Sequence, residues 1–309
     1  MMTMNAMKRS ALLTLLAGLA LGARPARAEV EVIATVPTLA ALAAEVGGAH
    51  VRVRSLALPT QDPHFVDAKP SLLLELNKAD LLVAVGLDLE VGWLPTLLTG
   101  ARNADIQRGT TGYLECSQHA SILEIPRGKV DRSMGDIHPG GNPHYLYDPR
   151  GARGCAGAIA QRLSAVDPGH ADDYKKNLRS FEQRLQAKAI AWQKLLAPHR
   201  GKAVVTYHRS WIYLLDWAGL REVGTLEPKP GIPPSPRHVA RVLEVARKAG
   251  ARAVLQESFY PDRMAKLVAE KIGARLVTPP GGPDVRRGQT YFQYMDAMVA
   301  DLAAALAAP

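Results

Sequence analysis

Short apolar runs alternate with amphipathic stretches through the first half of the chain. Residues 80–86 (DLLVAVG) are almost continuously apolar over the length of a strand, residues 29–36 (EVEVIATV) form another strand-length run that ends at Pro37, and residues 51–58 alternate. The predicted helices of this half are residues 38–48, 70–79 and 93–98, followed by residues 152–163. Strands that are apolar on both faces and alternate with helices predict a mostly parallel sheet covered on both sides.

Short apolar runs and amphipathic stretches also alternate in the second half of the chain. The predicted strands are residues 202–208, 221–226, 253–258 and 274–279, and the predicted helices are residues 210–219, a segment starting near Ser235, residues 261–273 and residues 289–307. A proline-rich loop, residues 227–236, interrupts this pattern. We therefore expect a second α/β unit with its own mostly parallel sheet.

A long helix is predicted between the two halves. Asp167 offers an N-cap and Pro168 suits the first helical position, and no proline follows before Ala197. About 30 helical residues would reach roughly 45 Å, which is long enough to join two lobes. A coiled-coil partner is the alternative, but the apolar stripe lasts only about three heptads. The chain is therefore predicted to consist of an N-terminal segment (residues 1–28), a first lobe (29–166), a linking helix (167–198) and a second lobe (199–309).

Residues 1–28 read as a secretory signal peptide. Lys8 and Arg9 precede a short apolar run, and Ala26-Arg27-Ala28 matches a small-residue cleavage pattern. Because no cysteine lies at the cleavage site, we expect a free periplasmic protein without a lipid anchor, and we expect it to be a monomer.

The net charge of the chain says little about its function. Cleavage would remove four basic residues and no acidic one, and would lower the formal net charge from +9 to +5. The remaining basic residues are scattered over predicted helix faces and are not interleaved with aromatic residues, so we expect no nucleic-acid partner. Cys116 and Cys155 could form a disulfide in an oxidising compartment, or remain two separate buried thiols. Neither has the spacing of a metal-binding pair.

Three histidines carry the candidate chemistry. His144 follows Asn142-Pro143 in the loop GDIHPGGNPHYLYDP, where proline restricts the backbone that presents the imidazole. His64 is presented in a similar way by the segment QDPHF. His208 ends the predicted strand KAVVTYH. Since ligands of open α/β sheets bind beyond the carboxyl ends of the strands, we expect these three side chains to meet in a cleft between the lobes.

Glu257, at the end of the predicted strand AVLQES, is the candidate fourth ligand, and water is the alternative. Three imidazoles and one carboxylate suit Zn²⁺. His138 shares the loop of His144 and could support a ligand or replace one. The other histidines are interpreted as surface residues: His50, His119, His170, His199 and His238.

Enzyme signatures are missing from the sequence. It has no HExxH, GxSxG, GxxxxGK[ST] or strand-following GxGxxG pattern. A three-histidine zinc hydrolase remains an alternative, but no residue stands in a fixed relation to the histidines as a general base. We therefore expect a binding protein rather than an enzyme.

The chain resembles the metal-binding solute-binding proteins of ABC importers, which capture zinc or manganese in the periplasm. The resemblance covers the whole mature chain and is carried by PTQDPHF, ADLLVAVGLDLE, GNPHYLYDP, the long helix and YHRSW. It implies a two-lobed α/β fold, an inner-membrane ABC permease as partner, and His64, His144 and His208 as the first three ligands. A histidine in the third place is similar to the zinc-preferring branch, since manganese binders more often have Glu there.

Two departures from that family stand out. Residues 116–136, where many zinc members carry a His-rich loop, contain only His119. The aspartate that often supplies the fourth ligand is replaced by Pro279 or Pro280 in TPPGGPD, which is why Glu257 is the substitute candidate. A manganese or iron binder of the same fold is the remaining alternative.

Overall fold

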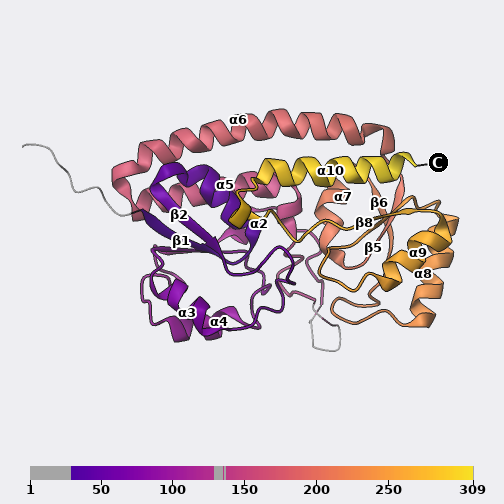
Figure 1. The fold of residues 1–309 in the computed structure, drawn as a ribbon, viewed down its shortest axis with the longest axis horizontal. Helices are drawn as coiled ribbons and strands as arrows, with labels where there is room; N and C mark the ends of the chain where they lie inside the picture. Colours follow the sequence, from indigo (N-terminus) through magenta and orange to yellow (C-terminus); the bar gives the residue numbers. More distant parts are fainter. Residues whose placement is uncertain (1–28, 129–134, 136, 309) are drawn as a thin grey trace, which may run out of the picture.

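The structure is a computed structural model that describes residues 29–128, 135 and 137–308. The predicted signal peptide and its cleavage site lie outside the described residues. Two four-stranded parallel sheets lie side by side, and two long helices lie on the same side of the molecule, one of which extends along both sheets (Figure 1).

The first sheet has the strand order β2-β1-β3-β4. Its strands are β1 (Val30–Ala34), β2 (Val51–Ser55), β3 (Leu81–Ala84) and β4 (Tyr113–Glu115), and its helices are α2 (Pro37–Gly47), α3 (Pro70–Asn77), α4 (Leu94–Ala101) and α5 (Pro149–Val166). Helices α3 and α4 pack on one face around Ile33 and Leu82, and α2 and α5 cover the other face. Burial on both faces explains the continuous apolar run of β3, whereas β1 carries one half-buried polar residue, Glu31.

The second sheet repeats this topology, with the order β6-β5-β7-β8. Its strands are β5 (Ala203–Thr206), β6 (Arg221–Thr225), β7 (Ala253–Leu255) and β8 (Arg275–Val277), and its helices are α7 (Ile212–Ala218), α8 (Pro236–Lys248), α9 (Arg263–Ile272) and α10 (Tyr291–Ala307). Helices α8 and α9 cover the outer face. The α/β prediction for both halves is confirmed.

The linking helix α6 (Ala171–Leu196) has 26 residues, or about 39 Å at 1.5 Å per residue. Helix α10 runs beside it (Figure 1), and Trp192 donates from Nε1 to Oδ1 of Asp296 over 2.8 Å. One hydrophobic core is continuous from the first sheet through α5, α6 and α10 to the inner face of the second sheet. The two lobes therefore share a core.

Several element boundaries differ from the sequence prediction. Helix α5 starts at Pro149 instead of residue 152, because the carboxylate of Asp148 accepts from the backbone N–H of Arg150. Asp167 does not cap α6, since its carboxylate accepts from the Tyr174 hydroxyl, and a 3₁₀ turn, Pro168–His170, precedes the helix. The prediction contained no strand at β4, which has only three residues.

Cys116, in the 3₁₀ turn directly after β4, and Cys155, in α5, are buried free thiols. Burial first, and the neighbouring Cys155 thiol second, raise the pKa of Cys116 well above its usual range. His199 is buried, so its interpretation as a surface residue was wrong. Over the described ranges, no helix combines the length and apolar character needed to cross a membrane.

Candidate metal centre

His64 is held by its own loop. Its Nδ1 and backbone N–H lie 2.7 and 3.0 Å from Oδ1 of Asp62, and both donate to that carboxylate. The Pro63 carbonyl accepts from Nε1 of buried Trp93 at 2.9 Å, which fixes the backbone just before the histidine. Nε2 of His64 is buried and has no hydrogen-bond partner. An imidazole whose Nδ1 is bonded to a carboxylate presents Nε2 to a metal in a defined orientation.

His144 is positioned by Asn142. The Asn142 side chain accepts from the backbone N–H of His144 at 3.0 Å and donates to the Arg209 carbonyl at 2.9 Å. Its own carbonyl accepts from the Tyr213 hydroxyl at 2.6 Å. Arg209 and Tyr213 belong to the second lobe, so this first-lobe loop is tied across the cleft. Nε2 of His144 is also buried without a partner.

His208 lies two residues beyond β5 and is buried. The preceding residue, Tyr207, continues the sheet by donating to Leu255 and accepting from the backbone N–H of Glu227. This pairing places the Glu227 carboxylate 2.7 Å from Nδ1 of His208, which leaves Nε2 for a metal. Sequence reasoning missed Glu227, which lies in the proline-rich loop and meets His208 only through the pairing of β5 with β6.

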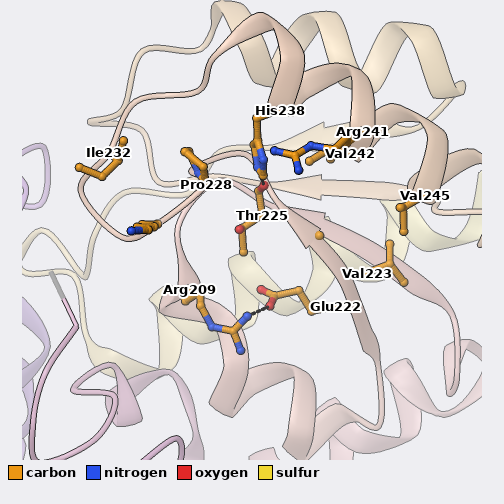
Figure 2. Close-up of a pocket in the computed structure, with 12 residues that line it drawn as sticks. Arg209, Glu222, Val223, Thr225, Pro228, Ile232, His238, Arg241, Val242 and Val245 are labelled. Atoms are coloured by element: carbon orange, nitrogen blue, oxygen red, sulfur yellow. Dashed lines mark hydrogen bonds and ion pairs between the residues drawn. The ribbon is translucent and has the colours of Figure 1, made fainter. Parts of the chain in front are cut away.

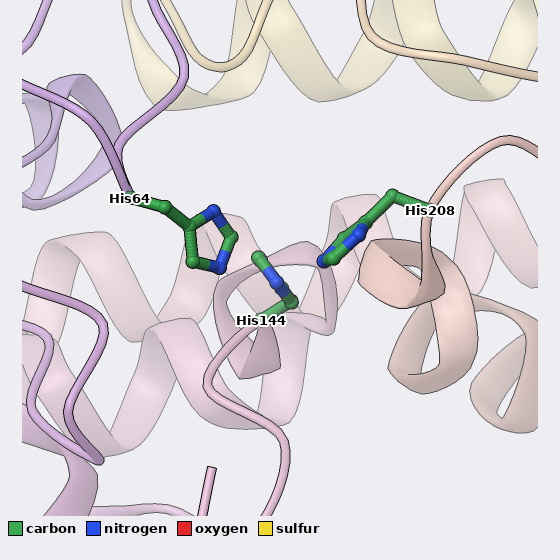
Figure 3. Close-up of side chains that lie close together, drawn as sticks. All are labelled: His64, His144 and His208. Atoms are coloured by element: carbon green, nitrogen blue, oxygen red, sulfur yellow. The ribbon is translucent and has the colours of Figure 1, made fainter. Parts of the chain in front are cut away.

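The three histidines converge (Figure 3). Their candidate ligand atoms all lie within 4.8 Å of one another, and their ring centroids are 5.2–5.3 Å apart. In a tetrahedral zinc site with Zn–N bonds of about 2.0–2.1 Å, ligand nitrogens are roughly 3.3 Å apart. Small side-chain movements would therefore bring the three nitrogens to bonding distance of one ion. The structure brings together the three histidines that the sequence singled out.

Glu257 lies close to this cluster without belonging to the group of three. It is buried two residues beyond β7, and with His64 and His144 it lines a small cavity of about 40 Å³. Its Oε1 accepts from the Tyr147 hydroxyl at 3.4 Å, whereas Oε2 is buried without a partner. Burial raises the pKa of this carboxyl group. An unpartnered carboxylate oxygen beside two candidate ligands has the chemistry of a fourth donor.

Electrostatics differ among the histidines. Burial, and then the nearby imidazoles of His208 and His64, hold the pKa of His144 well below 6.5. Burial lowers the pKa of His208 as well, but its hydrogen bond to Glu227 and the negative charges of Glu227 and Glu257 outweigh that effect and raise it above 6.5. His144 is therefore the neutral form that metals bind at neutral pH, while His208 competes with a proton.

His138 lies next to the cluster. Its ring centroid is 5.5 Å from that of His64, and its Nε2 is buried without a partner. Burial first, then the nearby His64 and His208, lower the pKa of His138 to about 4. Together with His144 and His208, it lines a cavity of about 410 Å³. His138 does not belong to the three residues whose ligand atoms lie within 4.8 Å of one another.

A larger hollow of about 900 Å³ lies on the second lobe between β6 and α8 (Figure 2). Its lining contains none of the three clustered histidines. Two polar pairs lie in this hollow: Arg209 donates to Glu222 at 2.8 Å, and His238 Nε2 donates to the Thr225 carbonyl at 2.8 Å. Among the described residues, the group of three or more metal-binding side chains lies at His64, His144 and His208 instead.

Known proteins are similar to this chain over most of its length. Residues 32–305 match the family model described as "Zinc-uptake complex component A periplasmic". The chain is 25% identical over 297 residues to the high-affinity zinc uptake system protein ZnuA of Paracoccus denitrificans, covering 85% of this chain and 87% of that one. It is 23% identical over 276 residues to the manganese ABC transporter substrate-binding lipoprotein PsaA of Streptococcus mitis, covering 86% of each.

Solved structures share the fold. A crystal structure of ZnuA superposes with a TM-score of 0.75 at 22% identity and covers 90% of this chain and 100% of its own. A manganese-bound periplasmic metal-binding protein from Candidatus Liberibacter asiaticus gives 0.73 at 18% identity, covering 90% and 99%. The fold, the family match over most of the chain and the curated relatives lead to one conclusion: this chain belongs to the periplasmic zinc-uptake component A family, the extracytoplasmic substrate-binding proteins of metal ABC transporters, which are not enzymes.

Proposed function

We propose that this protein binds one Zn²⁺ between its lobes and delivers it to the permease of an ABC importer in the inner membrane. His64, His144 and His208 are the proposed ligands, with Glu257 as the fourth. The observation that carries the proposal is the convergence of three imidazoles, two of which have Nδ1 bonded to a carboxylate. Such carboxylate–histidine pairs orient ligands in zinc sites.

The donor set favours zinc over manganese. Imidazole nitrogen suits Zn²⁺, whereas Mn²⁺ prefers sites rich in carboxylate and other oxygen donors, and zinc binds a given nitrogen site more tightly than manganese. The curated relatives include proteins named for zinc and for manganese, so the choice of metal rests on these side chains. Competition between Zn²⁺, Mn²⁺ and Fe²⁺ in equilibrium dialysis tests the choice of metal, and preferential retention of manganese would contradict the zinc assignment.

Three further features belong to the proposal. The mature protein is free in the periplasm without a lipid anchor, although relatives include lipoproteins. It is a monomer, and its lobes comprise residues 29–166 and 199–309, joined by residues 167–198. The positions of the two sheets and of α6 support these limits. Mass spectrometry of the exported protein and sedimentation at working concentration test the first two features.

Single alanine variants test the site. We expect His64→Ala, His144→Ala and His208→Ala each to weaken zinc binding at least tenfold, about 1.4 kcal/mol, by titration calorimetry. His119→Ala is the matched control, because that imidazole is exposed on a turn away from the cluster. Wild-type affinity in any of the three variants would remove that residue from the set of ligands.

A further inference from the structure

His138 combines two properties that the proposed site does not use. Over the described residues, the histidines whose Nε2 is buried without a hydrogen-bond partner are His64, His138 and His144. Two of these are proposed ligands. The third lies outside the group of three, although its ring is nearly as close to His64 as the ligand rings are to one another.

A tight turn fixes the backbone that carries the His138 ring. The His138 carbonyl accepts from the N–H of Gly141 at 3.1 Å, which closes the turn. Gly141 has φ +106°, and a Cβ there would lie 2.4 Å from Ile122 and 2.9 Å from the Leu123 carbonyl, so only glycine fits. The Leu87 backbone raises the pKa of the ring, against the larger effect of burial. The turn therefore fixes the backbone that carries the ring, and the buried Nε2 is left without a hydrogen-bond partner.

Two cavities meet at the histidine cluster. The larger one, about 410 Å³, is lined by His138, His144 and His208, and we call it the outer cavity; the smaller one, about 40 Å³, is lined by His64, His144 and Glu257, and we call it the inner cavity. The outer cavity has about ten times the volume of the inner one, so it offers a hydrated ion far more room. An ion that reaches Glu257 from the outer cavity has His138 beside its path.

We propose that His138 binds the incoming ion in the outer cavity, passes it to His64, His144 and His208, and binds it again on release. This inference rests on the proposed zinc function and assigns a route to the same site. A ligand that contacts the ion only in transit lowers the barrier equally in both directions. Its removal therefore slows capture and release by the same factor and leaves the affinity unchanged.

Stopped-flow kinetics test this role. Zinc capture is followed by tryptophan fluorescence after mixing with zinc chloride, and release is followed with excess chelator. We expect His138→Ala and His138→Asn to slow both rates about tenfold while the dissociation constant stays within threefold. Asparagine keeps a polar side chain of similar reach to Nδ1 but removes Nε2. His119→Ala is again the control.

The outcomes separate the alternatives. Wild-type rates in His138→Asn would overturn the proposal, even if His138→Ala were slow, because the ring would then serve only to anchor the loop. Tenfold weaker binding with faster release would also overturn it, since His138 would then be a resident ligand. Failure of the zinc site itself would appear elsewhere, as wild-type affinity in His144→Ala.

Discussion

The two sheets share one topology but carry different chemistry at equivalent positions. Thr35 donates to Val83 in the first sheet as Tyr207 donates to Leu255 in the second, and the same register pairs Ala57 with Thr35 and Glu227 with Tyr207. By this correspondence, the second-lobe residues His208, Glu227 and Glu257 match Val36, Ala57 and Val85 of the first lobe. The first sheet is apolar at all three places.

The first lobe instead presents its histidines from loops. His64 lies nine residues beyond β2, and His144 lies in the segment that leads into α5. Strand register aligns His208 with its carboxylate partner. The first-lobe ligands are instead positioned by hydrogen bonds within their loops: those of Asp62 and Pro63 position His64, and that of Asn142 positions His144. A shared fold therefore does not fix where the ligands lie, and each lobe positions its ligands by different contacts.

The largest expected effect concerns Glu257, the strand-end carboxylate of the second lobe. If it binds the ion, Glu257→Gln and Glu257→Ala should both weaken zinc binding at least tenfold, comparable to His208→Ala, because the site loses its anionic donor. Calorimetry of the three variants side by side measures this. Wild-type affinity in both Glu257 variants would leave a three-histidine site completed by water.

Acid should reduce zinc binding through the second-lobe histidine first. The pKa of His208 is raised above 6.5 and that of His144 lies well below it, so protonation of His208 begins first as the pH falls. Because zinc needs the neutral imidazole, affinity should drop about tenfold per pH unit once His208 is protonated. Titrations from pH 8 to pH 5 measure it, and a flat profile would show that imidazoles do not dominate the site.

Each lobe has a carboxylate bonded to Nδ1 of a proposed ligand: Asp62 in the first and Glu227 in the second. Glu227→Gln should cost about tenfold in zinc affinity and Asp62→Asn less, because partners of ligand histidines typically contribute tenfold or more and solvent screens a more exposed charge. The Glu227 side chain is 6% exposed and that of Asp62 is 20% exposed. Glu244→Gln on the surface of α8 is the control. Equal losses would contradict the ranking.

The smallest effect on affinity is expected from Tyr213→Phe, which removes a tie between the lobes. The hydroxyl accepts from the Leu123 N–H at 2.9 Å and donates to the Asn142 carbonyl at 2.6 Å. Leaving buried polar groups unpaired should lower the free energy of unfolding by about 1–3 kcal/mol, with zinc affinity within threefold of wild type. Urea unfolding and calorimetry test this. Normal stability with weak binding would show that the tie positions His144 directly.

Much of the fold could be predicted because its signals are local. The buried parallel strand β3 is apolar without alternation, β1 is apolar except for Glu31, and prolines mark the starts of α2, α3 and α8. Strand β4 was missed because three residues carry too little periodicity. The helix start at Pro149 was missed because the Asp148 cap was not recognised.

The site was partly predictable for the same reason. Proline-presented histidines and a strand-end histidine are visible in the sequence, and Asp62 adjoins its histidine in DPH. Glu227 was not visible, because only the parallel pairing of β5 with β6 brings it to His208. The burial of His199 also depends on contacts that no local pattern encodes.

The core that runs through both lobes governs how the chain folds. Phe181 in the middle of α6 packs against Tyr291 and Phe292 at the start of α10, so the last helix of the second half completes the core of the first. A fragment limited to residues 199–309 would expose that apolar face to water. We therefore expect the two lobes to unfold together in one transition, and the fragment alone to aggregate instead of folding as an independent domain.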